Sequence, residues 1–202
     1  LNDSEINRFL NEIRMVHSDL DIIINNAGIG FSNYFHQNSV FDDEKMIDLN
    51  CKTVVKISKV AVEIFEKNKN NNCYLINIAS SVSFLPLPYM SVYAATKSFI
   101  LSFSEGIRDE YKNKFKTLTI CPSGIDTSFQ DLAGVKKTAN NNLLSPLYVS
   151  EKIFKYVKRK DSGVKKIGLN SYALAILSSI IPLRYLTFIS GILFASMRKK
   201  DD

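Results

Sequence analysis

Residues 73–97 have the sequence CYLINIASSVSFLPLPYMSVYAATK. The first seven of these residues are mostly apolar, which is typical of a strand buried inside a parallel sheet. Ser80 follows this strand directly, and ligands of open α/β folds bind at the carboxyl edge of the sheet. In a helix from about 92 to 111, Tyr93 and Lys97 project from the same face because they are four residues apart. A hydroxyl, a phenol and an ammonium are therefore expected at one sheet edge.

The rest of the chain alternates between strand and helix patterns. Such alternation predicts an α/β fold with a doubly wound parallel sheet, right-handed crossovers and helices on both faces. Two polar stretches are expected to be loops, namely 68–72 and the longer 122–148, which has room for one short helix. The expected strands are 21–24, 73–79, 117–121 and 164–169, and the expected helices are 3–18, 42–67, 92–111 and 150–159.

Length and composition indicate one ordinary globular domain. The chain has 202 residues, of which 46% are apolar and 23% charged, with a net charge of +6. No basic helix is interleaved with aromatic residues, so nucleic-acid binding is not expected. Cys51, Cys73 and Cys121 lie far apart, which favours reduced thiols in the cytoplasm. His17 and His36 form no metal-binding pattern, so no metal is expected.

Tyrosine four residues before lysine is a weak signal by itself. Tyr148 and Tyr156 also precede a lysine by four residues. Only Tyr93 has a serine thirteen residues upstream, at the end of a predicted strand. This difference selects Tyr93 with Lys97 and Ser80 as the candidate catalytic group.

The chemistry of these three residues suits proton transfer to a carbonyl or alcohol oxygen. A free tyrosine has a pKa of about 10, so it exchanges protons slowly near neutral pH. A nearby Lys97 ammonium in a partly desolvated cleft could lower that pKa by about three units, which corresponds to roughly 4 kcal/mol. Ser80 could hydrogen-bond the substrate oxygen while Tyr93 gives or takes a proton and a cofactor exchanges hydride with carbon.

Two other polar features lie near predicted strand ends or on an apolar helix face. The run Asn25-Asn26-Ala27-Gly28 follows the first strand, and its small residues leave room for another group. The two amides could bridge neighbouring strands, bind a ligand or simply form a turn. Asn50 lies on or near the apolar face of the 42–67 helix, where its amide could satisfy buried backbone or hold a water molecule.

These residues together resemble the short-chain dehydrogenase/reductase family in order and spacing. The resemblance extends from about Leu1 to Leu169 and is greatest to uncharacterised bacterial-type oxidoreductases. It implies a Rossmann-like fold and NADP as cofactor, with NAD as the alternative. It also implies that Tyr93 is the general acid/base, Ser80 orients the substrate, Lys97 lowers the tyrosine pKa and binds the nicotinamide ribose, and Asn50 supports a water relay. The implied cofactor-binding residues are Asn25, Asn26, Ala27, Gly28, Tyr93, Lys97, Ile125 and Thr127.

The sequence departs from the family pattern in two places. The family begins with a strand and a Gly-rich T-G-x-x-x-G-x-G turn for the pyrophosphate, and these 202 residues contain no such turn. The chain is therefore expected to be an N-terminally truncated domain, residues 1–170, followed by a tail, residues 171–202. Ser123 replaces the glycine that usually follows proline in the turn after the 117–121 strand.

Two classes of function are compatible with this pattern. The first is an NAD(P)-dependent oxidoreductase acting on a hydrophobic carbonyl compound or secondary alcohol. The second is a catalytically inactive remnant or a partner-binding module of the same fold. An in-frame Gly-rich strand-turn-helix encoded upstream of Leu1 would favour the enzyme, and a stop would favour the remnant. A homo-oligomer stays open in either case.

The tail from Tyr172 to Met197 is mostly apolar and is interrupted by Pro182 and Arg184. A spanning helix, a core-packing helix pair and an interfacial anchor are three alternatives. The interruption leaves apolar runs that are too short for a bilayer core, which needs about 20 residues. We therefore expect peripheral membrane contact through residues 172–200, ending in the basic Arg198–Lys200, on a cytoplasmic protein.

Overall fold

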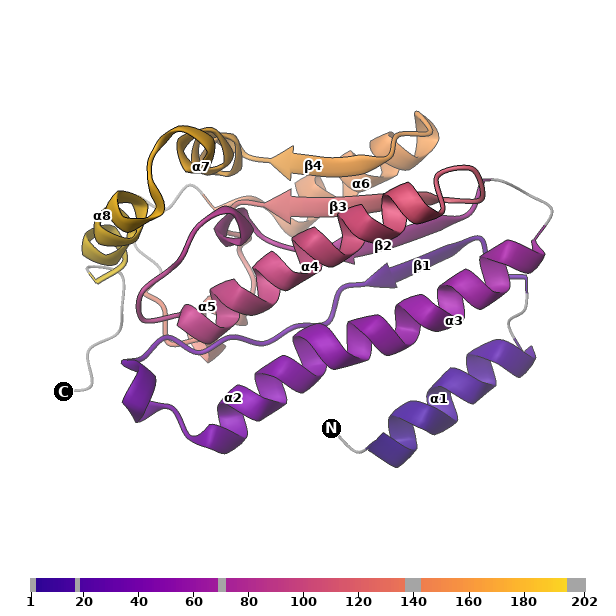
Figure 1. Cartoon of the computed structure of the whole chain (residues 1–202), viewed down its shortest axis with the longest axis horizontal. Coiled ribbons are helices and arrows are strands. Elements are labelled where there is room, and N and C mark those ends of the chain that lie inside the picture. Colours follow the sequence, from indigo (N-terminus) through magenta and orange to yellow (C-terminus); the bar gives the residue numbers. More distant parts are fainter. Residues whose placement is uncertain (1–2, 17–18, 69–71, 137–142, 196–202) are drawn as a thin grey trace.

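The computed structural model describes residues 3–16, 19–68, 72–136 and 143–195 (Figure 1). Parts of four expectations lie outside these ranges. They are the end of the first helix at 17–18, most of the 68–72 loop, residues 137–142 of the long loop, and the basic Arg198–Lys200.

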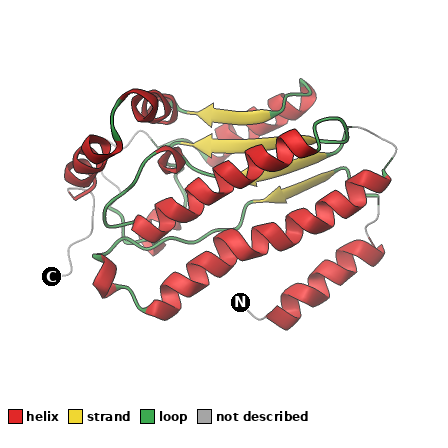
Figure 2. Cartoon of the chain, in the orientation of Figure 1, coloured by secondary structure: helices red, strands yellow, loops and turns green. Residues whose placement is uncertain are grey.

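Four parallel strands form the sheet, in the order β1-β2-β3-β4, and their carboxyl ends point in one direction (Figure 2). The register places Asn25 beside Asn77, and Asn77 beside Thr119. The residues that follow each strand therefore gather at one edge of the sheet. The strands are β1 Ile22–Asn25, β2 Tyr74–Ile78, β3 Lys116–Pro122 and β4 Gly163–Ile167.

Helices cover both faces of this sheet. On one face lie α3 and α4, and α6 packs against the apolar side chains of β2, β3 and β4 on the other. The expected α/β class with a parallel sheet is confirmed. The α-helices are α1 Asp3–Val16, α2 Val40–Ile47, α3 Val54–Lys67, α4 Ser91–Glu110, α5 Phe129–Leu132, α6 Pro146–Lys158, α7 Leu169–Ile180 and α8 Leu183–Ala195. A π-helical turn, η2 Asp48–Thr53, joins α2 to α3, and two short 3-10 turns are η1 Phe35–Gln37 and η3 Ser81–Phe84.

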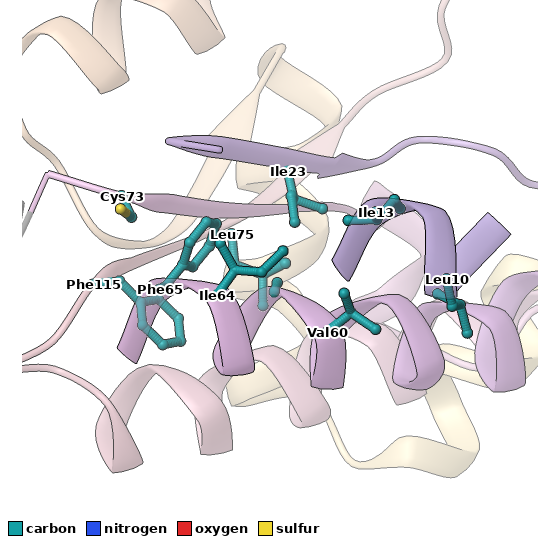
Figure 3. Packing of buried hydrophobic residues seen from close by; sticks show 10 residues of the cluster. Leu10, Ile13, Ile23, Val60, Ile64, Phe65, Cys73, Leu75 and Phe115 are labelled. Atoms are coloured by element: carbon teal, nitrogen blue, oxygen red, sulfur yellow. The ribbon is translucent and has the colours of Figure 1, made fainter. Parts of the chain in front are cut away.

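An apolar core fixes β1 and β2 against α3 (Figure 3). Phe65 of α3 meets Phe115 edge-on, with ring centroids 5.2 Å apart. From α1, Ile13 packs into the same cluster beside Ile23 of β1. These contacts set the positions of the strand ends from which the polar residues project.

The first strand differs from its expected burial on both faces. Ile22 is 42% exposed and Ile24 52% exposed, whereas Ile23 is buried. Among the described residues β1 is an edge strand, and α6 packs on the strands beyond it. A continuous apolar run could not distinguish an edge strand from a central one.

Two helices also differ from their expected bounds. The expected 42–67 helix contains the π turn η2, which inserts an extra residue between α2 and α3. Helix α6 begins four residues before the expected residue 150. Ser145 caps it by accepting a hydrogen bond from the Tyr148 N–H, and Pro146 occupies the first turn.

The apolar tail forms two helices, α7 and α8, with Pro182 between them. No helix within the described ranges is both long enough and apolar enough to cross a membrane. Gly168 precedes α7 with φ of +90°, a backbone conformation that favours glycine.

Candidate active site

Ser80 begins the 3-10 turn η3 immediately after β2. Its side-chain oxygen accepts a hydrogen bond from the Val82 N–H at 3.3 Å, and its own N–H donates to Ser83 Oγ at 3.2 Å. This reciprocal capping holds the half-buried hydroxyl at the carboxyl edge of the sheet.

The structure brings Ser80, Tyr93 and Lys97 together. The Ser80 hydroxyl lies near the Tyr93 phenol and favours its ionised form. Tyr93 and Lys97 are both buried on α4, and Lys97 Nζ lies 5.8 Å from the centroid of the Tyr93 ring. Lys97 Nζ also donates a 3.0 Å hydrogen bond to the carbonyl oxygen of Ile78, the last residue of β2. The end of one strand and one face of a helix therefore supply the whole group.

Burial determines the protonation of this group. Burial raises the pKa of Tyr93 to about 12, although the nearby Ser80 hydroxyl acts in the opposite direction. Burial also lowers the pKa of Lys97 to about 8. Loss of hydration is the largest influence on the pKa of each group, and the expectation that Lys97 lowers the tyrosine pKa stays a prediction. The phenol is protonated at neutral pH.

Asn50 lies in the π turn η2 and ties two elements of the site together. Its Oδ1 accepts from the Ile29 N–H at 3.0 Å, and its Nδ2 donates to the Ile29 carbonyl at 2.9 Å and to Thr96 Oγ1 at 3.0 Å. Thr96 Oγ1 in turn donates to the Tyr93 carbonyl at 2.8 Å. The sequence left open whether the Asn50 amide binds backbone groups or a water molecule. In the structure it hydrogen-bonds the N–H and the carbonyl of Ile29.

Asn25, the last residue of β1, is buried and holds the strands together, whereas the two residues that follow it are exposed. Asn25 is buried, and its Nδ2 donates to Asn77 Oδ1 at 2.8 Å and to Ser58 Oγ at 3.3 Å, so its amide bridges neighbouring strands. Asn26 and Ala27 are exposed at the sheet edge. Gly28 comes next and lies close to the site. A Cβ there would meet Asn50 Oδ1 at 3.2 Å and Lys97 Nζ at 3.3 Å.

Ile125 and Thr127 follow β3 at the same edge of the sheet. Thr127 is exposed, and its Oγ1 accepts a hydrogen bond from the Phe129 N–H at the start of α5. The Ile125 carbonyl accepts a hydrogen bond from the Gln130 side chain. Ser123, which replaces the family's usual glycine, accepts a 3.2 Å hydrogen bond from the Ser171 N–H and so anchors α7.

Three residues near the site were not among those expected from the sequence. A Cβ at Gly30 would approach Tyr93 Cδ2 to 2.8 Å and Phe129 Cζ to 2.9 Å. Phe129 packs beside Tyr93 with ring centroids 5.3 Å apart, and Thr96 links Asn50 to α4. For Gly30 the sequence did offer a signal, because it is the second glycine after the predicted 21–24 strand and a glycine leaves room for a neighbouring group. The other two contacts depend on tertiary packing.

Apolar side chains surround Tyr93. They come from the segment after β1, from α2, from the stretch that runs from η3 into α4, from the region around α5, and from α8. The members are Ile29, Phe31, Met46, Val82, Leu87, Met90, Val92, Ala94, Phe129, Ala133, Val135 and Phe194. The polar candidate group thus adjoins an apolar core cluster.

Comparison with known proteins assigns the family. The profile of the family described as short chain dehydrogenase matches residues 2–136. The chain belongs to the short-chain dehydrogenase family. A very-long-chain 3-oxoacyl-CoA reductase of Mus musculus is 30% identical over 101 residues, which are 48% of this chain and 31% of that protein. An NADP-dependent 3-hydroxy acid dehydrogenase of Shigella flexneri is 30% identical over 164 residues, which are 76% of this chain and 65% of that protein.

Solved structures agree with this fold. A short-chain dehydrogenase from Sphingobium yanoikuyae in complex with NADPH superposes with a TM-score of 0.75 at 22% identity, covering 90% of this chain and 73% of that one. The chain spans about a third of the length of the first curated relatives that it matches.

Proposed function

We propose that the protein is an oxidoreductase that transfers hydride between a nicotinamide cofactor and a carbonyl compound or secondary alcohol. The observation that carries this proposal is the placement of Ser80, Tyr93 and Lys97 together at the carboxyl edge of the sheet. A hydroxyl, a phenol and an ammonium in this arrangement are suited to binding one substrate oxygen and moving one proton.

Tyr93 acts as the general acid/base, and Ser80 orients the substrate oxygen by hydrogen bonding. Burial keeps the Tyr93 phenol protonated at neutral pH, so the site is prepared to donate a proton to the oxygen of a carbonyl being reduced. Asn50 acts through backbone and Thr96 contacts that hold the residue 29 segment against α4.

The residues present fit the nicotinamide end of NADP. An ammonium has three N–H donors, and Lys97 directs one to the Ile78 carbonyl, which leaves donors for ribose hydroxyls. Asn26, Ala27 and Gly28 border the site on one side, and Ile125 and Thr127 lie at the same edge. In this assignment Asn25 supports the cofactor site by fixing β1 to β2. When bound, the nicotinamide supplies or accepts the hydride.

NADP is favoured over NAD by the relatives. The Shigella flexneri relative is named NADP-dependent, and the Sphingobium yanoikuyae structure contains NADPH. A 3-ketoacyl-(acyl-carrier-protein) reductase from Brucella melitensis was solved with NADH, so NAD remains the alternative.

The substrate proposed is a hydrophobic carbonyl compound. The apolar side chains packed around Tyr93 support this class, because an aliphatic substrate placed beside the phenol would meet apolar neighbours. Relatives named as 3-oxoacyl-CoA and 3-ketoacyl reductases support a 3-oxoacyl thioester as the first compound to assay.

The test combines NADPH binding with NADPH oxidation. These 202 residues contain no Gly-rich pyrophosphate turn, so calorimetric titration of this chain is expected to show affinity weaker than micromolar. Oxidation of about 1 mM NADPH should depend on an added 3-oxoacyl thioester and fall when Ser80 is changed to alanine. Substrate-independent oxidation, or none at all, would contradict the proposal and favour an inactive or partner-binding form of the fold.

Three further expectations stay proposals. They are a division into a catalytic domain, residues 1–170, and a tail, residues 171–202; a homo-oligomeric assembly; and a cytoplasmic protein with peripheral membrane contact through residues 172–200. The exposed apolar faces of α7 and α8 support the last of these.

A further inference from the structure

Helices α7 and α8 carry a long exposed apolar surface. On α7 the exposed residues recur at spacings of three and four, so they share one face of the helix. On α8 the exposed apolar residues lie around most of the helix, and Leu186 and Ser190 are its buried residues. We call this set the C-terminal apolar surface, and it comprises Leu169, Tyr172, Ile176, Leu177, Ile180, Leu183, Tyr185, Phe188, Ile189, Ile192 and Leu193.

The inner sides of both helices are fixed to the domain. Ser171 is fully buried, and its Oγ donates to the Cys121 carbonyl at 2.6 Å. Ser190 Oγ donates to the Pro86 carbonyl at 2.9 Å, and a Cβ at Gly191 would lie 3.2 Å from Pro88 Cγ. Because these contacts hold α7 and α8 in place, the outward face cannot turn inward while they persist.

Basic side chains border the C-terminal apolar surface. Residues 162–202 contain six basic residues and two acidic ones, Asp201 and Asp202, a net charge of +4. Within the described part, Arg184 packs on the Tyr185 ring at 4.5 Å, and Lys166 Nζ lies 6.0 Å from the Tyr172 ring. Cations therefore border the exposed apolar side chains.

We propose that the C-terminal apolar surface binds an anionic lipid bilayer from one side, without crossing it. Apolar side chains would enter the acyl boundary while the cations reach lipid phosphates. Neither α7 nor α8 is long enough to cross a bilayer. A second copy of the chain is a poorer match for this surface, because Lys166 and Arg184 of one copy would approach the same cations of the other.

The surface lies beside the candidate active site. Both helices are at the end of the molecule toward which the strands point (Figure 1). Phe194 of α8 packs into the apolar cluster that contains Tyr93. A bilayer held by α7 and α8 would therefore lie near this cluster and could supply a lipid-borne carbonyl compound. This consequence rests on the proposed function, whereas the lipid binding does not.

Vesicle flotation of the full chain tests the proposal. Phosphatidylcholine vesicles containing about a third phosphatidylserine should carry the protein upward, and high salt should weaken this binding. Phe188→Ser with Ile192→Ser should reduce the bound fraction about tenfold or more. Phe154→Ser is the matched control, because Phe154 on α6 is 69% exposed and Phe188 is 68% exposed. Arg184→Gln should weaken binding to anionic vesicles but not to pure phosphatidylcholine.

Several outcomes would overturn the proposal. One is failure of the wild-type chain to float, and another is equal loss in the Phe154→Ser control. A third is a chain that binds no vesicles but forms a concentration-dependent dimer without lipid, if Phe188→Ser abolishes that dimer. The surface would then bind a second copy of the chain. Unchanged NADPH oxidation in a chain that does not bind vesicles would refute lipid binding and leave the proposed oxidoreductase intact.

Discussion

Lys97 places an ammonium group inside the protein. Its hydrogen bond to the Ile78 carbonyl gives little compensation for lost hydration, and burial lowers its pKa from 10.5 to about 8. No carboxylate within the described residues forms a salt bridge with it. Such a residue lowers stability, and its proposed role beside Tyr93 explains its presence.

We expect Lys97→Met to stabilise the fold while removing activity. At about pH 7 the variant lacks the buried charge, which stabilises it, and it also lacks the hydrogen bond to the Ile78 carbonyl, which destabilises it. The net change should raise the free energy of unfolding by about 1 to 2 kcal/mol. Urea unfolding followed by circular dichroism measures this change. The exposed Lys112→Met is the control and should change stability by less than about 0.5 kcal/mol.

The stability that Lys97→Met gains over the wild type should depend on pH in a defined direction. Between about pH 8 and pH 10.5 the folded protein has released the Lys97 proton and the unfolded chain still holds it. The stability of the wild type relative to Lys97→Met therefore rises with pH across this window. Below about pH 8 the destabilisation by the buried Lys97 charge is fully present. Parallel pH profiles for the two proteins would contradict the burial argument.

Gly28 lies against the site, where an added side chain would crowd two of its polar groups. An added Cβ would stand 3.3 Å from Lys97 Nζ and 3.2 Å from Asn50 Oδ1, so Gly28→Ala should displace the ammonium. We expect a loss of about tenfold or more in kcat/KM for NADPH oxidation. Gly106→Ala is the control, since a Cβ there has open space on a helix, and it should keep full activity and gain about 0.5 to 1 kcal/mol. Equal activity of both variants would show that the site tolerates the displacement.

At the level of elements, the turn between α2 and α3 shows what the sequence could and could not predict. Asn50 on an apolar helix face indicated a buried polar partner. Its partners, Ile29 and Thr96, lie in other segments and were not identifiable from helix spacing. The π turn was also not predicted, because one extra residue changes the apolar spacing of a long helix only slightly.

We expect Asn50→Ala to destabilise the fold by about 1 to 3 kcal/mol, because the part-buried N–H and C=O of Ile29 lose their partner. The midpoint of urea unfolding measures this effect. Asn11→Ala, on the exposed side of α1, is the control and should shift the midpoint little. A change below about 0.5 kcal/mol for Asn50→Ala would mean that water replaces the amide.

Across the whole molecule, local patterns predicted the strand and helix order and the placement of Ser80, Tyr93 and Lys97. Three features required the assembled structure. Ile22 and Ile24 are exposed because their strand is at the edge of the described sheet. The Asn25 amide is engaged by Asn77, which lies beside it only through strand register. The raised pKa of Tyr93 depends on burial by residues from several segments.

The central claim is that Tyr93 is the proton donor, and one substitution tests it most directly. Tyr148→Phe is the matched control, because Tyr148 also precedes a lysine by four residues and has the Lys152 Nζ 5.2 Å from its ring. Turnover by Tyr93→Phe should fall about 10²- to 10⁴-fold with NADPH binding unchanged, while Tyr148→Phe should match the wild type. Retention of more than about a tenth of the activity by Tyr93→Phe would assign the acid role to another group.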